Sequence, residues 1–280
     1  HLNSLFFLPN VILTSIAFLI DKKVIISVRG ELEGYALTQG NSQMKKVILK
    51  YYRFLSHGII YHATSDSEKC NINKFFPENK YVVCIPNLID YEKPIEQYKE
   101  DYFLFLGRIN PIKSIDKIII GFSCSKFFKE SNYKLIIAGT GDVTYMNYLN
   151  DLIISKGLSN SISFPNKIFQ GQEKIDLLSK SKYLFLMSES ENFGNVVIEA
   201  LINGVVPVTS LGTPWSILEY EKVGYHFDNT IGNIANKIDF FIKMHHDDDF
   251  NKMSSKGREF AETKFGVSNN INKYISMYSI

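Results

Sequence analysis

The sequence has 280 residues, of which 45% are hydrophobic and 21% charged, and its formal net charge is +2. This composition predicts a globular chain of one or two domains with a substantial core. A nearly balanced charge argues against a nucleic-acid partner, which needs a concentrated basic surface. The cysteines Cys70, Cys84 and Cys124 are odd in number and lack metal-ligand spacing, so we expect reduced, buried thiols and a cytoplasmic protein.

The chain begins with an apolar segment, residues 6–20, which is too short to cross a bilayer. Polar residues and a proline interrupt it, and no basic stretch precedes it. We therefore predict a buried helix over residues 9–19 rather than a signal peptide.

Short apolar runs and amphipathic segments then alternate along the chain, which predicts parallel sheets covered by helices. The expected strands are residues 23–28, 59–63, 80–85, 103–106, 134–138, 162–164, 183–187 and 205–209. The expected helices are residues 44–55, 67–75, 115–122, 146–155, 172–179, 215–221, 231–241, 254–263 and 268–278. Residues 90–102 are charged and have no clear period, so we expect a linker between two domains there.

One stretch, residues 188–204, joins two expected strands through a polar loop and an apolar helix. Glu191 in the loop precedes Glu199 in the helix by eight positions, and Gly204 ends the helix. The backbone of Gly194 and the next residues forms the first helical turn, whose N–H groups are available to an anion. Carboxylates for hydroxyls and amides for phosphate suit a nucleotide sugar. An ordinary strand–loop–helix unit with a solvated Glu191 explains the spacing equally well.

A second polar loop follows the expected strand 103–106. Arg108 offers a planar fork and Lys113 a point charge, a pair that suits a diphosphate at the carboxyl end of a strand. The alternative is that both are solvated loop cations. Gly139 and Gly141 also follow a strand, but the third glycine of a dinucleotide fingerprint is absent.

An acidic run at residues 247–249 follows two histidines and is similar to the metal-binding carboxylates of certain sugar-transfer enzymes. Because it lies between amphipathic segments near the C-terminus, we interpret it as a solvated connection and predict no metal site.

Taken together, the segments resemble the retaining GT-B glycosyltransferases of family four. The resemblance rests on the E-x7-E segment with its following Gly204–Pro207 strand, and on residues 105–116, 213–215, 27–31, 64–65 and 85–87. It covers nearly the whole chain, and its motifs occur in the family's order.

The resemblance implies an α/β GT-B fold, with two Rossmann-like domains, each built on a parallel sheet. We expect an acceptor-side N-terminal domain over residues 1–93 and a nucleotide-sugar-binding domain over 94–265. Residues 266–280 are expected to form a helix that returns to the first domain. The family's early glycine-rich loop is missing, so we expect the first domain to be incomplete. The chain is then a fragment of a longer enzyme or a truncated, inactive nucleotide-sugar-binding module.

The resemblance also implies roles for single residues. Arg108 and Lys113 would hold the diphosphate and Glu191 would face the donor sugar, so these three are the expected catalytic residues. Glu199 would bind the ribose hydroxyls. The other expected donor-binding residues are Asn192, Phe193, Gly194, Asn195, Val196, Gly107, Gly139, Lys167 and Ile168, and the expected acceptor-side residues are His1, Arg29 and Asn87.

The implied activity is that of a retaining hexosyltransferase-type enzyme of bacterial surface-polysaccharide synthesis. It would move a sugar from a nucleotide-diphosphate-sugar donor to a glycan or lipid-linked acceptor, with no metal and no cofactor. An epimerase or a phosphorylase on the same architecture is a weaker alternative. A phosphorylase would need a Schiff-base lysine and a cofactor pocket, which have no specific support here, and release of nucleoside diphosphate only with acceptor would reject an epimerase. We expect a cytoplasmic location that includes the inner face of the plasma membrane. The basic residues Lys45, Lys46, Lys50 and Arg53 either contact anionic lipid there or form a solvated helix face.

Overall fold

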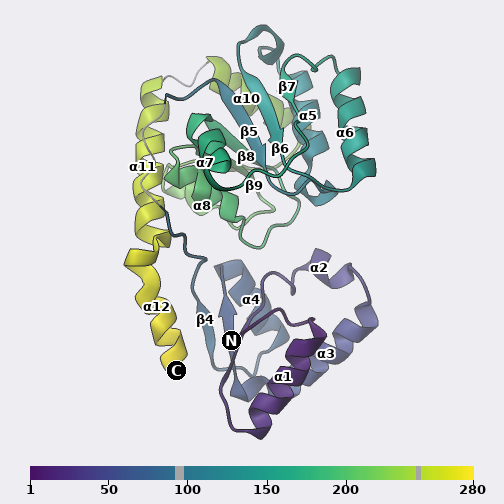
Figure 1. The fold of residues 1–280 in the computed structure, drawn as a ribbon, viewed down its shortest axis with the longest axis vertical. Helices are drawn as coiled ribbons and strands as arrows, with labels where there is room; N and C mark the ends of the chain where they lie inside the picture. The colour runs from purple at the N-terminus through teal and green to yellow at the C-terminus, as the bar shows by residue number, and fades with distance from the viewer. Residues whose placement is uncertain (92–97, 244–246) are drawn as a thin grey trace. The chain divides into compact units, whose positions relative to one another are not determined.

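The computed structural model describes residues 1–91, 98–243 and 247–280, and the chain divides into two compact units (Figure 1). Unit 1 comprises His1–Leu88, Ser190–Phe193 and Asn270–Ile280, and unit 2 comprises Ile89–Glu189 and Gly194–Asn269. The expected boundary at residue 93 lies outside the described residues, as do residues 92–97 of the expected linker.

Unit 1 is built on a four-stranded parallel sheet of order β1-β2-β3-β4. Its strands are β1 (Leu2–Asn3), β2 (Val24–Ser27), β3 (Ile59–Ala63) and β4 (Val82–Cys84). Its helices are α1 (Leu8–Leu19), α2 (Gly34–Thr38), α3 (Ser42–Leu55), α4 (Asp66–Phe75) and most of α12 (Val267–Ser279), with the short 3-10 turn η1 (Ser56–Gly58). Every residue of β2 and β3 is buried, as expected for parallel strands covered on both faces. Tyr61 of β3 stacks on Phe76 with 4.5 Å between ring centroids, which joins the sheet to the end of α4.

Helix α1 corrects the expectation of a buried apolar helix. Its buried residues are the polar Asn10 and Thr14, while most of its large apolar side chains are exposed. The Asn10 amide donates to the carbonyl oxygens of Asn3 and Ser4, at 2.6 and 2.9 Å. The inner side of α1 thus satisfies backbone groups at the end of β1 and packs Val11, Ala17 and Phe18 against the core, while its other large apolar side chains are exposed.

Unit 2 is built on a six-stranded parallel sheet of order β10-β9-β8-β5-β6-β7. Its strands are β5 (Tyr102–Leu106), β6 (Lys134–Ala138), β7 (Ile162–Ser163), β8 (Tyr183–Leu186), β9 (Val206–Ser210) and β10 (Tyr225–Phe227). Since β5 lies between β8 and β6, the strand order reverses there, and such switch points are where open α/β sheets bind ligands.

Helices cover this sheet, with α5 and α10 packed together and α11 packed on α8. The helices are α5 (Ile115–Cys124), α6 (Val143–Ser155), α7 (Gly171–Lys180), α8 (Asn195–Ile202), α9 (Ile217–Tyr220), α10 (Ile231–Lys243) and α11 (Asp247–Phe265), with the 3-10 turns η2 (Pro111–Lys113) and η3 (Phe128–Glu130). The core between sheet and helices is rich in aromatic rings. Tyr183 of β8 and Phe241 of α10 stack with centroids 4.1 Å apart, and Phe103 of β5 meets Phe122 of α5 at 5.1 Å.

The parallel α/β architecture predicted from the alternating pattern is confirmed, but two local expectations besides that for α1 were wrong. Residues 247–249 are not a connection: they form the first turn of α11, where carboxylates interact favourably with the positive end of the helix. The cysteines are not buried thiols, because Cys70 and Cys124 lie on the exposed sides of their helices. Cys84 is half-buried, and burial raises the pKa of its thiol to about 11.

Candidate functional site

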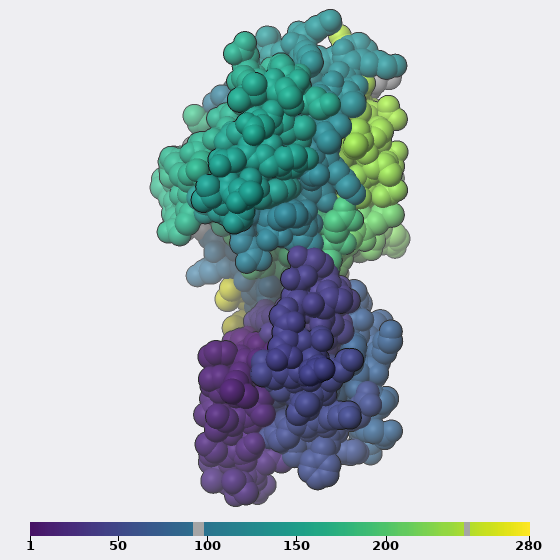
Figure 2. Space-filling view, turned by 90° about the vertical axis from the view of Figure 1, so that its right-hand side faces the viewer, coloured from purple at the N-terminus to yellow at the C-terminus, as the bar shows by residue number. Residues whose placement is uncertain are grey.

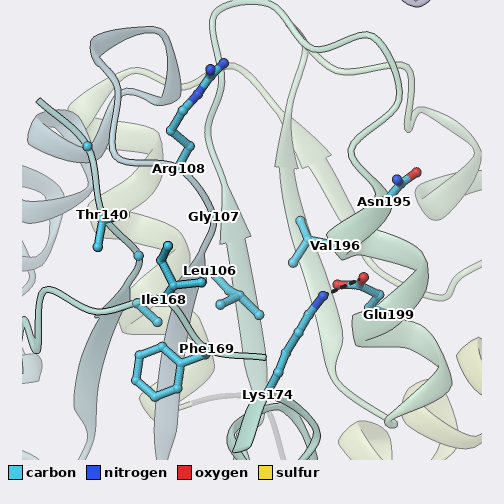
Figure 3. Close-up of a pocket in the computed structure, with 13 residues that line it drawn as sticks. Leu106, Gly107, Arg108, Thr140, Ile168, Phe169, Lys174, Asn195, Val196 and Glu199 are labelled. Atoms are coloured by element: carbon cyan, nitrogen blue, oxygen red, sulfur yellow. Dashed lines mark hydrogen bonds and ion pairs between the residues drawn. The ribbon is translucent and has the colours of Figure 1, made fainter. Parts of the chain in front are cut away.

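A cavity of about 620 Å³ lies at the carboxyl ends of β5 and β6 in unit 2 (Figure 3). Four segments line it: the end of β5 with the loop that follows, the end of β6 with its loop, the segment that leads into α7 together with the first turn of that helix, and the first turns of α8. The lining residues are Leu106, Gly107, Arg108, Ala138, Gly139, Thr140, Gly141, Ile168, Phe169, Lys174, Asn195, Val196 and Glu199. The structure thus brings together seven residues that the sequence predicted from separate segments, namely Gly107, Arg108, Gly139, Ile168, Asn195, Val196 and Glu199.

The glycines after β6 are needed because two loops approach each other closely beneath the cavity. The N–H of Gly107 donates to Ala138 O at 3.0 Å and that of Ile109 to Thr140 O at 2.8 Å, so the parallel pairing continues past the strand ends. A Cβ atom on Gly139 would lie 1.8 Å from the carbonyl oxygen of Gly107. Glycine is therefore required here because a side chain would not fit between the two loops, whose close packing shapes the cavity. This packing explains the glycines, so they need not belong to a dinucleotide-binding motif.

Helix α8 begins at the edge of the cavity. Gly194, with φ of +75°, is its N-cap and turns the loop into the helix, and Gly204, with φ of +66°, follows its C-terminal end. Asn195 and Val196 in the first turn line the cavity, so the positive end of the helix macrodipole lies at its wall. Arg108 extends from the end of β5 toward the upper rim in Figure 3 and is exposed. One cation and one helix N-terminus thus border the same space, an arrangement that favours an anion.

An ion pair lies at the other end of the cavity, between Lys174 of α7 and Glu199 of α8. The Lys174 Nζ atom is 2.7 Å from Glu199 Oε1, and the side chains are 31% and 23% exposed (Figure 3). Glu199 was predicted and Lys174 was not. The sequence did contain a feature that could have predicted the pair. A lysine near the N-terminus of a helix interacts unfavourably with the positive end of the macrodipole, so a nearby carboxylate is expected to compensate its charge. Phe169 beside it was also missed, and with Ile168 it adds an apolar wall (Figure 3).

Lys113, at the end of η2, does not line the cavity. Its loop is held by Glu189, whose carboxylate accepts hydrogen bonds from Ser114 Oγ at 2.9 Å, Lys117 Nζ at 2.6 Å and Asn229 Nδ2 at 3.0 Å. The Lys117 ammonium is the main cause that lowers the pKa of Glu189. Glu189 was not predicted, although it lies in the same acidic loop as Glu191.

Lys167 is also outside the cavity lining. Its ammonium forms an ion pair with Glu173 and lies 4.6 Å from the centroid of the Phe169 ring. Lys167 therefore supports the apolar wall from behind, and no contact places it at the cavity itself.

The predicted residues Glu191, Asn192 and Phe193 belong to a segment that packs with unit 1. The Asn192 amide donates to Thr64 Oγ1 at 3.2 Å, and its Cβ lies against Gly30, where a side chain would clash at 2.6 Å. Burial raises the pKa of Glu33 next to this segment, and the nearby carboxylates, including Glu191, raise it further. The structure therefore gathers carboxylates around this segment.

The predicted acceptor-side residue His1 belongs to a hydrogen-bonded chain in unit 1. His1 Nε2 lies 2.8 Å from Ser27 Oγ, Ser27 Oγ lies 2.6 Å from His62 Nδ1, and His62 Nε2 lies 2.8 Å from Ile85 O. Because a carbonyl only accepts, His62 Nε2 carries a proton, and burial lowers the pKa of His62 and so favours the neutral ring.

The proton positions then follow along the chain. In neutral His62, Nδ1 accepts from the Ser27 hydroxyl, whose oxygen in turn accepts from His1 Nε2–H. The other ring nitrogen of His1, Nδ1, lies 2.6 Å from the Tyr278 hydroxyl oxygen. Because both ring nitrogens of His1 have a hydrogen-bond partner, the orientation of the ring is fixed.

The other predicted acceptor-side residues, Arg29 and Asn87, contact each other directly. The Arg29 guanidinium donates to Asn87 Oδ1 and, at 3.2 Å, to Asn3 Oδ1. The two residues thus come together at the carboxyl ends of unit 1's strands, although they lie far apart in sequence.

Neither a metal site nor a membrane span is present in the described residues. Over residues 1–91, 98–243 and 247–280, no three His, Cys, Asp or Glu side chains are grouped so that they could hold a metal ion. In the same part of the chain, no helix has the length and apolar character needed to cross a membrane.

Comparison with known proteins places these features in a family. Residues 89–260, more than half of the chain, match the family model described as glycosyl transferases group 1. N-acetyl-alpha-D-glucosaminyl L-malate synthase of Bacillus anthracis is 22% identical over 234 residues, which are 77% of this chain and 58% of that protein. The chain thus spans less than two thirds of this relative.

Solved structures share the fold. HepE of Anabaena, crystallised with UDP and glucose, superposes with a TM-score of 0.78 at 17% identity, over 96% of this chain and 76% of that one. Sucrose-phosphate synthase of Thermosynechococcus elongatus superposes with a TM-score of 0.80 at 15% identity, over 99% and 72% of the two chains. The predicted GT-B-like α/β fold is confirmed.

Proposed function

The chain belongs to the glycosyl transferases group 1, and we propose that it transfers a sugar from a nucleotide-diphosphate-sugar donor with retention of configuration. The proposed acceptor is a glycan or lipid-linked glycan of a surface polysaccharide. The observation that carries the proposal is the cavity of unit 2, where Arg108, the N-terminus of α8 and the Lys174–Glu199 pair border one space.

Each part of this cavity matches a part of the donor. The Glu199 carboxylate accepts hydrogen bonds from the ribose hydroxyls, and Ile168 and Phe169 give the base an apolar wall. The diphosphate lies against Arg108 and the first turn of α8. Breaking the glycosyl–phosphate bond builds negative charge on the diphosphate, and fixed cations and N–H groups stabilise that charge as it develops.

The remaining predicted residues complete the proposal. We assign Lys113 to the diphosphate, Glu191 to the donor sugar, and His1, Arg29 and Asn87 to the acceptor side. Retention follows if the acceptor attacks the face from which the phosphate departs. The departing phosphate oxygen then accepts the acceptor's proton, so the reaction needs no strong side-chain base, no metal and no cofactor.

We propose a cytoplasmic reaction, because nucleotide sugars are the donors and all three cysteines are free thiols. UDP is the first nucleotide to test, since the HepE structures contain UDP, UDP-glucose or UDP with glucose.

The test combines calorimetric titration with UDP and an assay of UDP release from UDP-sugars in the presence of acceptor extracts. Arg108→Ala should weaken UDP binding by roughly 10-fold or more, because a hydrogen bond to a charged group contributes about 1.5–3 kcal/mol. Lys126→Ala, which removes an exposed cation elsewhere in unit 2, is the matched control and should leave binding unchanged.

The outcomes separate the two functions that the sequence left open. Binding with acceptor-dependent UDP release supports the transferase. Binding with no turnover for any UDP-sugar and acceptor supports a nucleotide-sugar-binding module. No binding of any nucleoside diphosphate would refute both.

A further inference from the structure

The turn η2 is joined to α5 by a residue in an unusual conformation. Ser114 has a φ of +50° and a ψ of 42°, a left-handed backbone that a residue other than glycine adopts only at a cost in stability. It is the N-cap of α5, where a serine side chain normally accepts a hydrogen bond from the first helical turn, but its hydroxyl donates to Glu189 instead. Two local preferences are given up here, so contacts with another segment hold this residue in place.

Glu189 supplies these contacts, and it binds the chain on both sides of Lys113. Its N–H donates to Ile112 O at 2.8 Å, and its Oε1 atom accepts from Ser114 Oγ at 2.9 Å. The same oxygen accepts from Lys117 Nζ, in the first turn of α5, at 2.6 Å. Lys113 lies between Ile112 and Ser114, so the backbone that carries it is held from before and from behind by one residue.

The backbone of Glu189 is itself anchored to the ends of neighbouring strands. The Asn229 amide, from the segment after β10, donates to Glu189 Oε1 at 3.0 Å. The Ser210 hydroxyl, at the end of β9, donates to Ser188 O at 2.5 Å. Gly212 packs so closely that a Cβ atom on it would lie 2.5 Å from the carbonyl oxygen of Glu189. Glu189 is therefore a fixed support that transmits the position of the strand ends to η2.

An ordinary surface ion pair does not account for this arrangement. Such a pair would need only Lys117, whereas Glu189 also accepts from Ser114 and Asn229, which are 2% and 9% exposed. Hydrogen bonds to an ionised acceptor are stronger than those between neutral groups. The carboxylate thus joins two buried side chains from segments that lie far apart in the sequence.

We propose that Glu189 is a positioning residue of the donor site, which acts through Ser114 to hold Lys113 where it meets the diphosphate. The inference rests on the proposed function, because that function assigns Lys113 to the diphosphate. Without the anchor, the turn samples other geometries, and binding of the diphosphate must order it again. That ordering lowers the affinity for the diphosphate and leaves the contacts of the base and the ribose unchanged.

The preference for UDP over UMP measures this effect, because the two ligands differ only in the second phosphate. In calorimetric titrations the wild type should prefer UDP. Glu189→Ala should reduce that preference roughly two- to tenfold and leave the Kd of UMP unchanged. Glu189→Gln keeps an oxygen that accepts from Ser114, so it should keep the preference of the wild type.

The matched control is Asp151→Ala. It removes an exposed carboxylate from α6, whose teal atoms lie on the face of unit 2 that Figure 2 turns toward the viewer. Asp151 is outside the cavity lining, so this variant should bind UDP and UMP as the wild type does.

Two further variants separate positioning from folding. Ser114→Gly removes the hydroxyl but also relieves the left-handed backbone, so the Tm should stay close to that of the wild type while the preference for UDP falls. In Lys113→Ala the anchor has no side chain left to position. The double variant Lys113→Ala/Glu189→Ala should therefore show the same preference as Lys113→Ala alone.

Three results would overturn the proposal. The first is an unchanged preference for UDP over UMP in Glu189→Ala, and the second is an equal loss of UMP and UDP binding, which a general loss of structure would cause. The third is a double variant that loses the product of the two single effects. If the wild type binds neither nucleotide, the proposed function is refuted and this inference with it. If the wild type prefers UDP and Glu189→Ala does so equally, only this inference fails.

Discussion

The ion pair between Lys174 and Glu199 gives the sharpest prediction about the donor site. In Lys174→Met the carboxylate of Glu199 keeps its place on α8 but loses the partner that fixes its orientation at 2.7 Å. Both side chains are partly exposed, so the pair itself contributes only about 0.5–1 kcal/mol to folding, and we expect a small change in Tm. The larger effect should be on binding, because a mobile carboxylate must be ordered when the ribose hydroxyls bind to it.

Ordering one flexible side chain costs about 0.5–1.5 kcal/mol, so Lys174→Met should weaken UDP binding by roughly two- to tenfold. Glu199→Gln removes the charged acceptor itself and should weaken binding by at least tenfold. Because the two residues act on the same hydroxyls, the double variant should lose less than the sum of the single losses.

Calorimetric titrations with UDP and 2′-deoxy-UDP make the measurement specific to ribose. Wild-type protein should prefer UDP, and both variants should reduce that preference. A preference that is unchanged in Glu199→Gln would show that Glu199 does not contact the ribose. Tighter UDP binding by Lys174→Met would show that the ion pair competes with the ribose instead of preparing for it.

Three further predictions concern stability and its dependence on pH. Gly139→Ala places a Cβ atom 1.8 Å from the Gly107 oxygen, so we expect a loss of about 2–4 kcal/mol in urea unfolding together with weaker UDP binding. Burial lowers the pKa of His62, so the unfolded chain binds the proton more readily and stability should fall as the pH drops through about 6.5. His62→Gln should reduce the loss of stability below about pH 6.5. The pKa of His226 is also lowered, so His226→Gln measures how much of the pH dependence comes from that residue instead. Burial lowers the pKa of Lys99 to about 7, so stability should fall as the pH drops from about 10.5 to 7, and Lys99→Met should remove that dependence.

Each of these three predictions can be contradicted by a specific result. Unaltered stability of Gly139→Ala would mean that the loops after β5 and β6 separate at little cost. A pH profile that keeps its slope in His62→Gln, or in Lys99→Met over the alkaline range, would mean that the residue is solvated as freely in the folded chain as in the unfolded one.

Local sequence determined most of the elements of this protein. The apolar runs of unit 2 became strands because a parallel strand buried on both faces needs continuous hydrophobicity. Helix α8 could be predicted from Gly194 to Gly204, since left-handed backbone at both ends favours glycine. The same local pattern placed Glu199 and Asn195 on that helix, and Arg108 in the loop after β5, so half of the cavity wall could be predicted from the sequence alone.

What the sequence could not supply depends on contacts between distant residues. The Lys174–Glu199 pair spans 25 positions, and the chain from His1 through Ser27 to His62 joins three segments, two of them strands. Secondary-structure propensities cannot predict such pairs, because the two residues come together only when the parallel sheet has formed and has brought strand ends and helices next to each other.

The outward apolar face of α1 is the clearest case of a decision made by tertiary structure. Composition and length alone predicted a buried helix, since apolar side chains normally face a core. The direction was decided by Asn10, whose amide satisfies carbonyl groups that the chain exposes after β1. An unpaired buried carbonyl is costly, so polar Asn10 took an inner position beside the half-buried Val11, Ala17 and Phe18, and the remaining large apolar residues of the helix are exposed.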